Sequence, residues 1–575
     1  MILQALTQLY EDLAARGAIA RRGWGDQKIS YALCLSEDGS LTDAVPMFVE
    51  AQAGKKTVLR PRKMELPAAV TRSSGVLPNF LWDNSSYLLG VDDKGKPERS
   101  QKCFEACVQL HHQLLDGVDT AASRAVRAYF DTWTPENARL HPALTDCWED
   151  LMKGANLVFR VNGHFVQEDP AIQAAWDGYY GSSGGEKVQC LVTGRLDVPE
   201  PVHPSIRGVA GAQSSGAAIV SFNAPAFCSY GKEQSLNAPV GRYAAFAYTS
   251  ALNYLLADRD SVQRIGDTTV VCWAEGAEPT YQKFALTFLF GAQPPEQITT
   301  DDLRATVKHL ANQEPCVELN LDPGRNFYIL GLAPNAARLS VRFFHRSSFG
   351  DLMRNVNAHH ERMKIVGSPF EYIPLWAMLR ETVNPKSTDK SPSPVMAGAT
   401  ARAIFSGQPY PAALLEATML RIRAEREITP GRAAILKAYY LRNPNPQCPE
   451  EVLHVSLNEN STNIPYTLGR LFAVYEAVQE KANPGINATI KDKYFNSAAS
   501  TPATIFPILD NLCPKHLRKL QPGLRVFYDR QIAQLKDVFG ESYPARLTLP
   551  EQGSFNLGYY HQKQARYNKK EENEA

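Results

Sequence analysis

The sequence predicts an α+β protein, with a mixed α/β N-terminal region followed by an all-α C-terminal helical bundle. Two patterns and a break between them support this class. Strand-like and helix-like patterns occur together before residue 382, and helix-like patterns dominate after residue 397. The intervening residues 382–397 are poor in apolar side chains and dense in Pro, Ser and charge, which is typical of a linker. We therefore expect a body over 1–381, a linker over 382–397 and a helical bundle over 398–575.

The N-terminal region is expected to begin with an amphipathic helix, because Ile2, Leu6, Leu9 and Leu13 recur at helical spacing. Apolar patterning predicts strands over 30–35, 46–52, 188–193, 218–222, 267–274, 327–332 and 337–345. Helical patterns cover 97–135, part of 138–180, and 242–258. In the C-terminal bundle, helices separated by short breakers are expected over 409–427, 429–441, 463–481, 501–511 and 523–539.

The overall charge excludes one broad class of nucleic-acid binder. Lys and Arg number 61 and Asp and Glu number 60, so the net charge of +1 excludes a histone-like protein but not a binder with clustered cations. Residues 401–575 hold 22 basic and 17 acidic side chains, so the predicted bundle is mildly basic. The ten cysteines are thinly spread, and the sequence shows no secretory signal and no long apolar run. We therefore expect a cytoplasmic protein.

Motifs for catalysis or metal binding are weak. The sequence has no dinucleotide-binding fingerprint, and no cofactor is expected. Residues 181–185 match G-x-S-x-G, but they form a Gly/Ser loop that ends a helical stretch, not the strand-to-helix turn of a nucleophile elbow. Cys103, Cys107 and His111 fall on one face of a predicted helix, which favours a buried face over a metal site because no convincing CxxC pair supplies further ligands. One enzymatic alternative stays open, a hydrolase that uses Ser215 or His203 in the 203–235 stretch.

Two stretches have a composition that suits nucleic-acid binding. The first, residues 51–72, is a basic cluster that contains one acidic residue, Glu65. It leads into a loop rich in Ser and Asn. The second, residues 203–237, places glycines beside hydroxyl and amide side chains. Glycine lets a backbone approach a phosphate chain closely, and amides and hydroxyls bond base edges or phosphates without net charge.

Four longer blocks then point to a family. They read TRSSGVLPNFLWDNSSYLLG (71–90), CLVTGRLDVPEPVHPSIRGVAGAQSSGAAIVSFNAPAFCSYGKEQSLNAPVG (190–241), FYILGLAPNAARLSVRFF (327–344) and YTLGRLFAVYEAVQEKANPGINATIKDKYFNSAASTPATIFP (466–507). In order and composition, the blocks resemble the large subunit of the type I-C CRISPR Cascade surveillance complex. The similarity runs nearly end to end.

The resemblance implies a non-catalytic subunit of an RNA-guided antiviral ribonucleoprotein. In such a complex a guide RNA (crRNA) reads the target by base pairing, while the protein reads a short flanking motif, the PAM, on duplex DNA. The large subunit is implied to carry that recognition, to help start strand separation and R-loop formation, to help hold the displaced strand, and to help recruit a separate helicase–nuclease. Other implied partners are the backbone and 5′-handle-binding Cascade subunits and a small helical subunit, which the C-terminal region resembles. A purely structural scaffold is the remaining alternative.

Composition and these blocks together predict two groups of site residues. The group expected to face DNA or the PAM comprises Lys55, Lys56, Arg60, Arg62, Lys63, Arg72, Ser73, Ser74, Asn79, Asn84, Arg207, Gln213, Ser214, Ser215, Asn223, Lys232, Gln234 and Asn237. The group expected along the displaced strand comprises Arg470, Lys491, Lys493, Tyr494, Phe495, Lys515, Arg518 and Lys519. In the second group, Tyr494 and Phe495 are expected to stack on bases.

Overall fold

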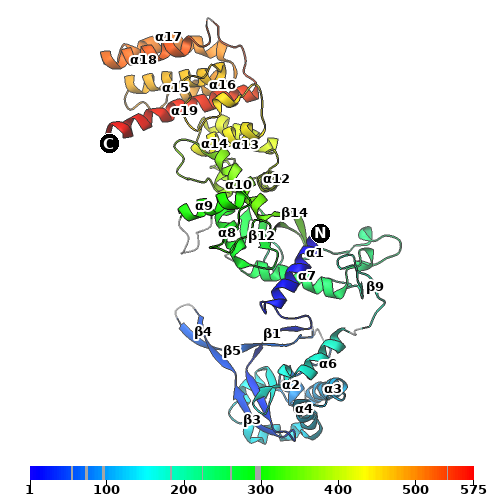
Figure 1. Ribbon diagram of the computed structural model, residues 1–575. Helices are drawn as coiled ribbons and strands as arrows, with labels where there is room; N and C mark the ends of the chain where they lie inside the picture. Colours follow the sequence, from blue (N-terminus) through cyan, green and yellow to red (C-terminus); the bar gives the residue numbers. More distant parts are fainter. Residues whose placement is uncertain are drawn as a thin grey trace. The chain divides into compact units, whose positions relative to one another are not determined.

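The computed structural model describes residues 1–53, 56–70, 75–93, 97–181, 184–222, 224–258, 262–291, 300–540 and 542–574. It confirms the α+β class, with strands toward the N-terminus and many helices toward the C-terminus (Figure 1). The chain divides into two compact units. Unit 1 comprises Leu3–Pro204 and Phe222–Ala251, and unit 2 comprises Ser205–Ser221 and Leu252–Ala575.

Unit 1 contains a five-stranded mixed sheet in the order β3-β2-β7-β6, with β8 paired to β7. Its strands are β2 (Tyr31–Leu35), β3 (Leu41–Pro46), β6 (Trp82–Asp83), β7 (Leu157–Val161) and β8 (His164–Phe165). Because β2 and β7 are parallel, no tight turn can join them, and a crossover is required. The helices of that crossover are α2 (Ser85–Leu88), α3 (Pro97–Leu115), α4 (Ala121–Thr132) and α5 (Trp148–Met152).

Aromatic side chains from the crossover fill the core against this sheet. Phe130 of α4 contacts both Phe104 of α3 and Phe159 of β7, with ring centroids 5.9 and 5.6 Å apart. The buried helix face predicted from the sequence is confirmed on α3 at Cys103, Cys107 and His111. The core therefore holds α3 and α4 firmly on β7, and with them the loop that precedes β6.

A second sheet in unit 1 is three-stranded and antiparallel, in the order β1-β5-β4. Its strands are β1 (Trp24–Ile29), β4 (Phe48–Ala53) and β5 (Lys56–Pro67). Met64 and Leu66, near the end of β5, are buried with Ile29 in a small core, whereas Arg60 and Arg62 earlier in the strand are exposed. The apolar pattern predicted β4 but not β1 or β5, because charged residues obscure the alternation of these two strands.

Loops and short elements make up most of the described residues between 184 and 241. Before and after them lie α1 (Ile2–Ala15), α6 (Pro170–Gly181) and α7 (Arg242–Ala257), all within predicted helical ranges. The short elements are β9 (Val188–Gln189), β10 (Leu196–Asp197) and 3-10 turns over Pro225–Phe227 and Gln234–Asn237. The strand predicted over 218–222 is wrong. Ala218 forms an isolated bridge to Arg338, and the residues after it do not continue the pairing that a strand requires.

Unit 2 contains a four-stranded antiparallel sheet in the order β11-β12-β13-β14. Its strands are β11 (Gln263–Ile265), β12 (Thr268–Ala274), β13 (Asn326–Asn335) and β14 (Arg338–Ser348), and they confirm three predicted strands. The helices associated with this sheet are α8 (Pro279–Phe290), α9 (Thr300–Ala311), α10 (Phe349–Met363), α11 (Leu375–Arg380) and α12 (Pro394–Ser406). Every residue of β12 is buried, so this strand lies in the interior of the unit.

The C-terminal helices, yellow to red in Figure 1, continue unit 2. They are α13 (Ala412–Glu425), α14 (Pro430–Arg442), α15 (Ile464–Ala482), α16 (Ile490–Ser500), α17 (Pro502–Leu517), α18 (Pro522–Lys536) and α19 (Leu549–Glu574). Every residue of α15 from Pro465 to Val478 is buried. A Cβ atom on Gly469 would lie 2.0 Å from the carbonyl oxygen of Phe555, and one on Gly558 would lie 2.0 Å from that of Tyr466. Glycine at both positions therefore lets the backbones of α15 and α19 touch.

The segment predicted as a linker lies within unit 2. Helix α12 begins at Pro394, inside the range 382–397, and proline suits the first turn of a helix because its missing N–H has no partner there anyway. Residues 382–393 connect α11 to α12. The domain boundaries at 381 and 398 stay predictions, whereas the compact units divide after Pro204, Ser221 and Ala251.

Candidate nucleic-acid interface

The basic cluster at 51–72 lies mainly on β5, the central strand of the three-stranded sheet. Arg60, Arg62 and Lys63 are exposed there, and Lys63 stands directly opposite the exposed Lys28 of β1. Like charges placed opposite each other on neighbouring strands destabilise a sheet. We call this group the β1–β5 basic cluster (Lys28, Arg60, Arg62 and Lys63); because side chains alternate along a strand, Lys28 and Lys63 lie on one face of the sheet, and Arg60 and Arg62 lie on the other. The opposed pair Lys28 and Lys63 therefore suits an anionic partner better than it suits the stability of the fold. Sequence reasoning missed Lys28, because only the strand register brings it to Lys63.

Several predicted residues lie outside the described part of the chain: Lys55, Arg72, Ser73, Ser74 and Asn223. The backbone of Lys56 begins β5, and its side chain also lies outside the description.

The structure corrects the prediction that Asn79 faces DNA, and it gives the side-chain oxygen of Asn84 a role within the fold. Asn79 is only 4% exposed, and its side-chain oxygen accepts a hydrogen bond from the backbone N–H of Val70 at 2.9 Å. The side chain of Asn84 accepts from the N–H of Ser86 at 3.1 Å and so caps α2. Both amides thus satisfy backbone donors within the chain, as buried polar groups must be satisfied.

The loop over 205–221 presents four of the predicted residues on its surface, namely Arg207, Gln213, Ser214 and Ser215. Hydrogen bonds fix its backbone to unit 2: the N–H of Arg207 donates to the Asn253 side chain at 2.8 Å, and that of Ala210 donates to the hydroxyl of Thr269 at 3.0 Å. Gly216, at φ +104°, leaves no room for a Cβ, which would lie 2.6 Å from Ser205. The polar side chains are therefore displayed from a fixed loop.

The loop over 225–237 is organised by Asn237, whose half-buried side chain bonds the backbone of the loop. Its oxygen accepts from the N–H of Ser229 at 2.8 Å, and its NH₂ group donates to the carbonyls of Lys232 and Gln234 at 3.0 and 2.9 Å. Asn237 therefore shapes the loop, whereas Lys232 and Gln234 are exposed. At the tip, Tyr230 is 99% exposed with φ +53°, so a free aromatic ring projects from a fixed turn. Tyr230 lies in the 203–237 stretch whose composition suits nucleic-acid binding, but it was not among the predicted site residues.

The hydrolase alternative draws no support from the geometry of His203. The Nδ1 atom of this buried histidine lies 2.7 Å from the hydroxyl of Tyr248, and burial lowers the pKa of His203 to about 4. Ser214 and Ser215 are exposed on the 205–221 loop of unit 2, whereas His203 belongs to unit 1.

Sequence reasoning missed a basic and aromatic cavity of about 500 Å³ in unit 1. Its lining comes from distant segments and comprises Arg22, Tyr179, Tyr180, Glu200, Pro204, Arg242 and Phe246. The guanidinium of Arg22 lies 5.8 Å from the centroid of the Tyr180 ring, and Arg242 lies 3.9 Å from the carboxylate of Glu200. Burial raises the pKa of Glu200, an effect that both arginines oppose. The pairs Arg21–Arg22 and Tyr179–Tyr180 were visible in the sequence, but nothing there brought them together.

The structure also corrects two residues of the displaced-strand group. The guanidinium of Arg470 is buried in α15, where it donates to the side chain of Gln562 at 3.1 Å and to the carbonyl of Glu459 at 3.0 Å. Phe495 is 1% exposed and packs edge-to-face on Phe472, so its ring is not available to a base. Both side chains belong to the interior of the helical region.

The other residues of that group are at least partly accessible. Lys493, Lys515, Arg518 and Lys519 are exposed, and Lys491 and Tyr494 are half-buried. The ammonium of Lys493 lies 5.0 Å from the centroid of the Tyr494 ring, and Lys519 donates to the side chain of Asn483 at 2.9 Å. Burial lowers the pKa of Lys491, with the nearby charge of Lys563 acting in the same direction.

Comparison with known proteins gives one family. The model of the family described as CRISPR-associated protein (Cas_Csd1) matches residues 6–567, so the match includes segments of both compact units. No curated protein matches the chain. In the described residues, no helix combines the length and the apolar character that crossing a bilayer requires. The chain therefore belongs to the CRISPR-associated Csd1 family, and this membership supports its assignment as a subunit of a Cascade-type complex.

Proposed function

We propose that the chain is the non-catalytic large subunit of a type I-C Cascade complex in the cytoplasm. In this role it recognises the PAM on duplex DNA, helps start strand separation and R-loop formation, and helps recruit a separate helicase–nuclease. Its partners are the crRNA, the target duplex with its displaced strand, the backbone and 5′-handle-binding subunits, and a small helical subunit. The observation that carries this proposal is the family match over residues 6–567.

The β1–β5 basic cluster supports a contact with the phosphates of the flanking duplex. Its four cations are exposed, and the opposed pair Lys28 and Lys63 is better satisfied by phosphate than by its own sheet. The net charge of only +1 fits this role. In an RNA-guided complex, base pairing supplies the sequence reading, and the protein contacts only a short flanking duplex itself.

The 225–237 loop supports a role in strand separation. Proteins that kink or open a duplex insert an apolar or aromatic side chain between base steps, and the inserted residue must project from a firmly held backbone. Tyr230 meets both conditions, because its side chain is free and Asn237 fixes the turn behind it.

The test is the salt dependence of duplex binding by the assembled complex, using a target whose flanking motif has been selected from a library of flanking sequences. The variant carries three substitutions on β5, namely Arg60→Gln, Arg62→Gln and Lys63→Gln. A matched control removes three exposed cations on α3 and α4, namely Arg99→Gln, Lys102→Gln and Arg124→Gln. For each phosphate that the variant no longer neutralises, the slope of log affinity against log salt should become shallower by about 0.9.

The proposal predicts a shallower slope and weaker binding for the β5 variant, with the control unchanged. Equal behaviour of both variants would show that the β1–β5 basic cluster does not contact the duplex. Failure of the wild-type complex to distinguish flanking motifs, with the chain still assembled, would instead favour a structural scaffold over PAM recognition.

A further inference from the structure

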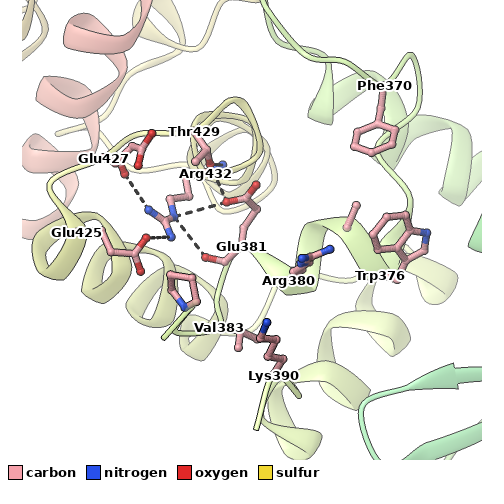
Figure 2. Close-up of a pocket in the computed structure, with 12 residues that line it drawn as sticks. Phe370, Trp376, Arg380, Glu381, Val383, Lys390, Glu425, Glu427, Thr429 and Arg432 are labelled. Carbon is pink, nitrogen blue, oxygen red and sulfur yellow. Dashed lines mark hydrogen bonds and ion pairs between the residues drawn. The ribbon is translucent and has the colours of Figure 1, made fainter. Parts of the chain in front are cut away.

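Unit 2 contains a second cavity that has no role in the proposed function described above. It measures about 480 Å³ and lies among α11, the segment that leads to α12, and the region joining α13 to α14. Figure 2 shows an ionic cluster around Arg432 on one side, the pair Phe370 and Trp376 on the other, and Arg380 and Lys390 between them. A volume of this size falls in the range of small-ligand sites.

The ionic side of the cavity is satisfied internally. Arg432 is buried, and its guanidinium donates to the carboxylate of Glu425 at 2.6 Å and to the carbonyl of Glu381 at 3.3 Å. The hydroxyl of Thr429 donates to the carboxylate of Glu381 at 2.6 Å. Charge-assisted bonds of this kind hold both carboxylates in place. The negative charges of Glu381 and Glu425 are therefore compensated by the protein itself.

The open side presents aromatic surface and positive charge. Trp376 is 48% exposed and Phe370 is 41% exposed, and their rings meet edge-to-face with centroids 6.1 Å apart. The indole of Trp376 therefore packs against Phe370 and still keeps about half of its surface accessible. Arg380 and Lys390 are exposed beside this pair, and within the described residues neither forms an ion pair with a carboxylate. An indole next to two uncompensated cations has the chemistry to bind a base and its flanking phosphates.

We infer that this cavity is a binding site for single-stranded nucleic acid. One base stacks on the indole of Trp376, and the phosphates on either side pair with Arg380 and Lys390. The inference rests on the proposed function and deepens it, because a complex that opens a duplex releases a strand that a site of this kind can hold. DNA and RNA share the chemistry that the site reads, so the test must compare the two.

The experiment measures binding of fluorescently labelled oligothymidylate and oligouridylate to the purified full chain by anisotropy over a salt series. Trp376→Ala should raise the Kd roughly 5- to 150-fold, the range for loss of one stacked base, and Trp376→Phe should restore most of the affinity. Arg380→Gln combined with Lys390→Gln should make the salt slope shallower by about 0.7 for each phosphate of the single strand that is no longer neutralised. Lys386→Gln is the matched control, because Lys386 is exposed in the same segment but does not line the cavity.

Weaker DNA binding in the Trp376→Ala and double variants, at unchanged melting temperature, supports the inference and assigns the displaced strand to this site. The same loss with RNA alone also supports the site but assigns it to the guide. Unchanged oligonucleotide binding in both variants overturns the inference. The inference is also overturned if the only defect of the variants is that the assembled complex loses a protein subunit. None of these results depends on PAM recognition, because no duplex is present. Failure here is therefore distinguishable from failure of the proposed function.

Discussion

His111 provides a sharp test of how the N-terminal core holds its loops. The ring is 0% exposed, its Nδ1–H donates to the carbonyl of Cys107 at 2.8 Å, and its Nε2 accepts from the N–H of Leu81 at 2.9 Å. Leu81 has φ +65°, a conformation that costs energy for a non-glycine residue, so this hydrogen bond helps to hold a strained turn. A proton on Nε2 would replace the acceptor with a donor, and the bond to Leu81 would be lost.

The size of the effect follows from the pKa. Burial lowers the pKa of His111 to about 4 in the folded protein, against about 6.5 in an unfolded chain. A depressed pKa means that the unfolded state binds more protons between these values, so the histidine's stabilising contribution is complete above pH 6.5 and is lost as the pH falls through 4. Between pH 7 and pH 5, the folded state should lose about 2 kcal/mol through this residue alone.

The assay is hydrogen exchange of the backbone around Leu81 at pH 7 and pH 5, corrected for intrinsic exchange rates, in wild type and His111→Gln. Glutamine can accept from Leu81 but does not titrate, so the other buried histidines contribute equally to both proteins and cancel. The free energy of protection in wild type should fall about 2 kcal/mol further than in the variant. An equal fall in both proteins, or a His111 titration midpoint near 6.5, would refute the reasoning.

Three further outcomes are expected. Gly558→Ala should destabilise the helical region by about 1–3 kcal/mol in urea unfolding, because the new Cβ would collide with the Tyr466 carbonyl. The control Gly523→Ala should be close to neutral, because a Cβ on Gly523 meets no atom within 4 Å. Burial lowers the pKa of Lys437 to about 8, so the unfolded state binds more protons between pH 8 and about 10.4. The free energy of unfolding should therefore rise by up to about 3 kcal/mol across that window, and Lys437→Met should abolish the rise. Tyr230→Ala should leave the melting temperature unchanged, because the ring is 99% exposed, while weakening target opening by the assembled complex about fivefold or more in a permanganate footprint.

The sequence predicted helices and strands correctly where a local apolar pattern defines them. It did not predict the environment of a side chain whose contacts come from a distant part of the chain. Helix α7 and strands β13 and β14 follow from their own periodicity and agree with the structure within a few residues. By contrast, Arg470 lies on a helix that is surrounded by others, and the Gln562 side chain that it bonds lies 92 residues away. No spacing rule could identify it as interior.

Distant contacts also explain why the candidate interface was only partly predicted from the sequence. Arg60, Arg62 and Lys63 are exposed, which leaves the charge-clustering prediction possible, but only the register of β1 against β5 brings Lys28 opposite Lys63. The cavity around Trp376 was missed for a related reason. Its wall includes residues of the 382–397 segment, whose composition indicated only a linker, and Arg432 of α14 bonds both Glu381, which precedes that segment, and Glu425 of α13.

The close approach of α15 and α19 also constrains when the helical region can fold during synthesis. Helix α19 is synthesised after α15, so the face of α15 that it covers stays open to solvent until α19 has emerged from the ribosome. During that interval, apolar residues of α15 are exposed to association with other chains. A shorter polypeptide begun within the gene could carry a closed bundle only if it started before Ile464 and ran through α19.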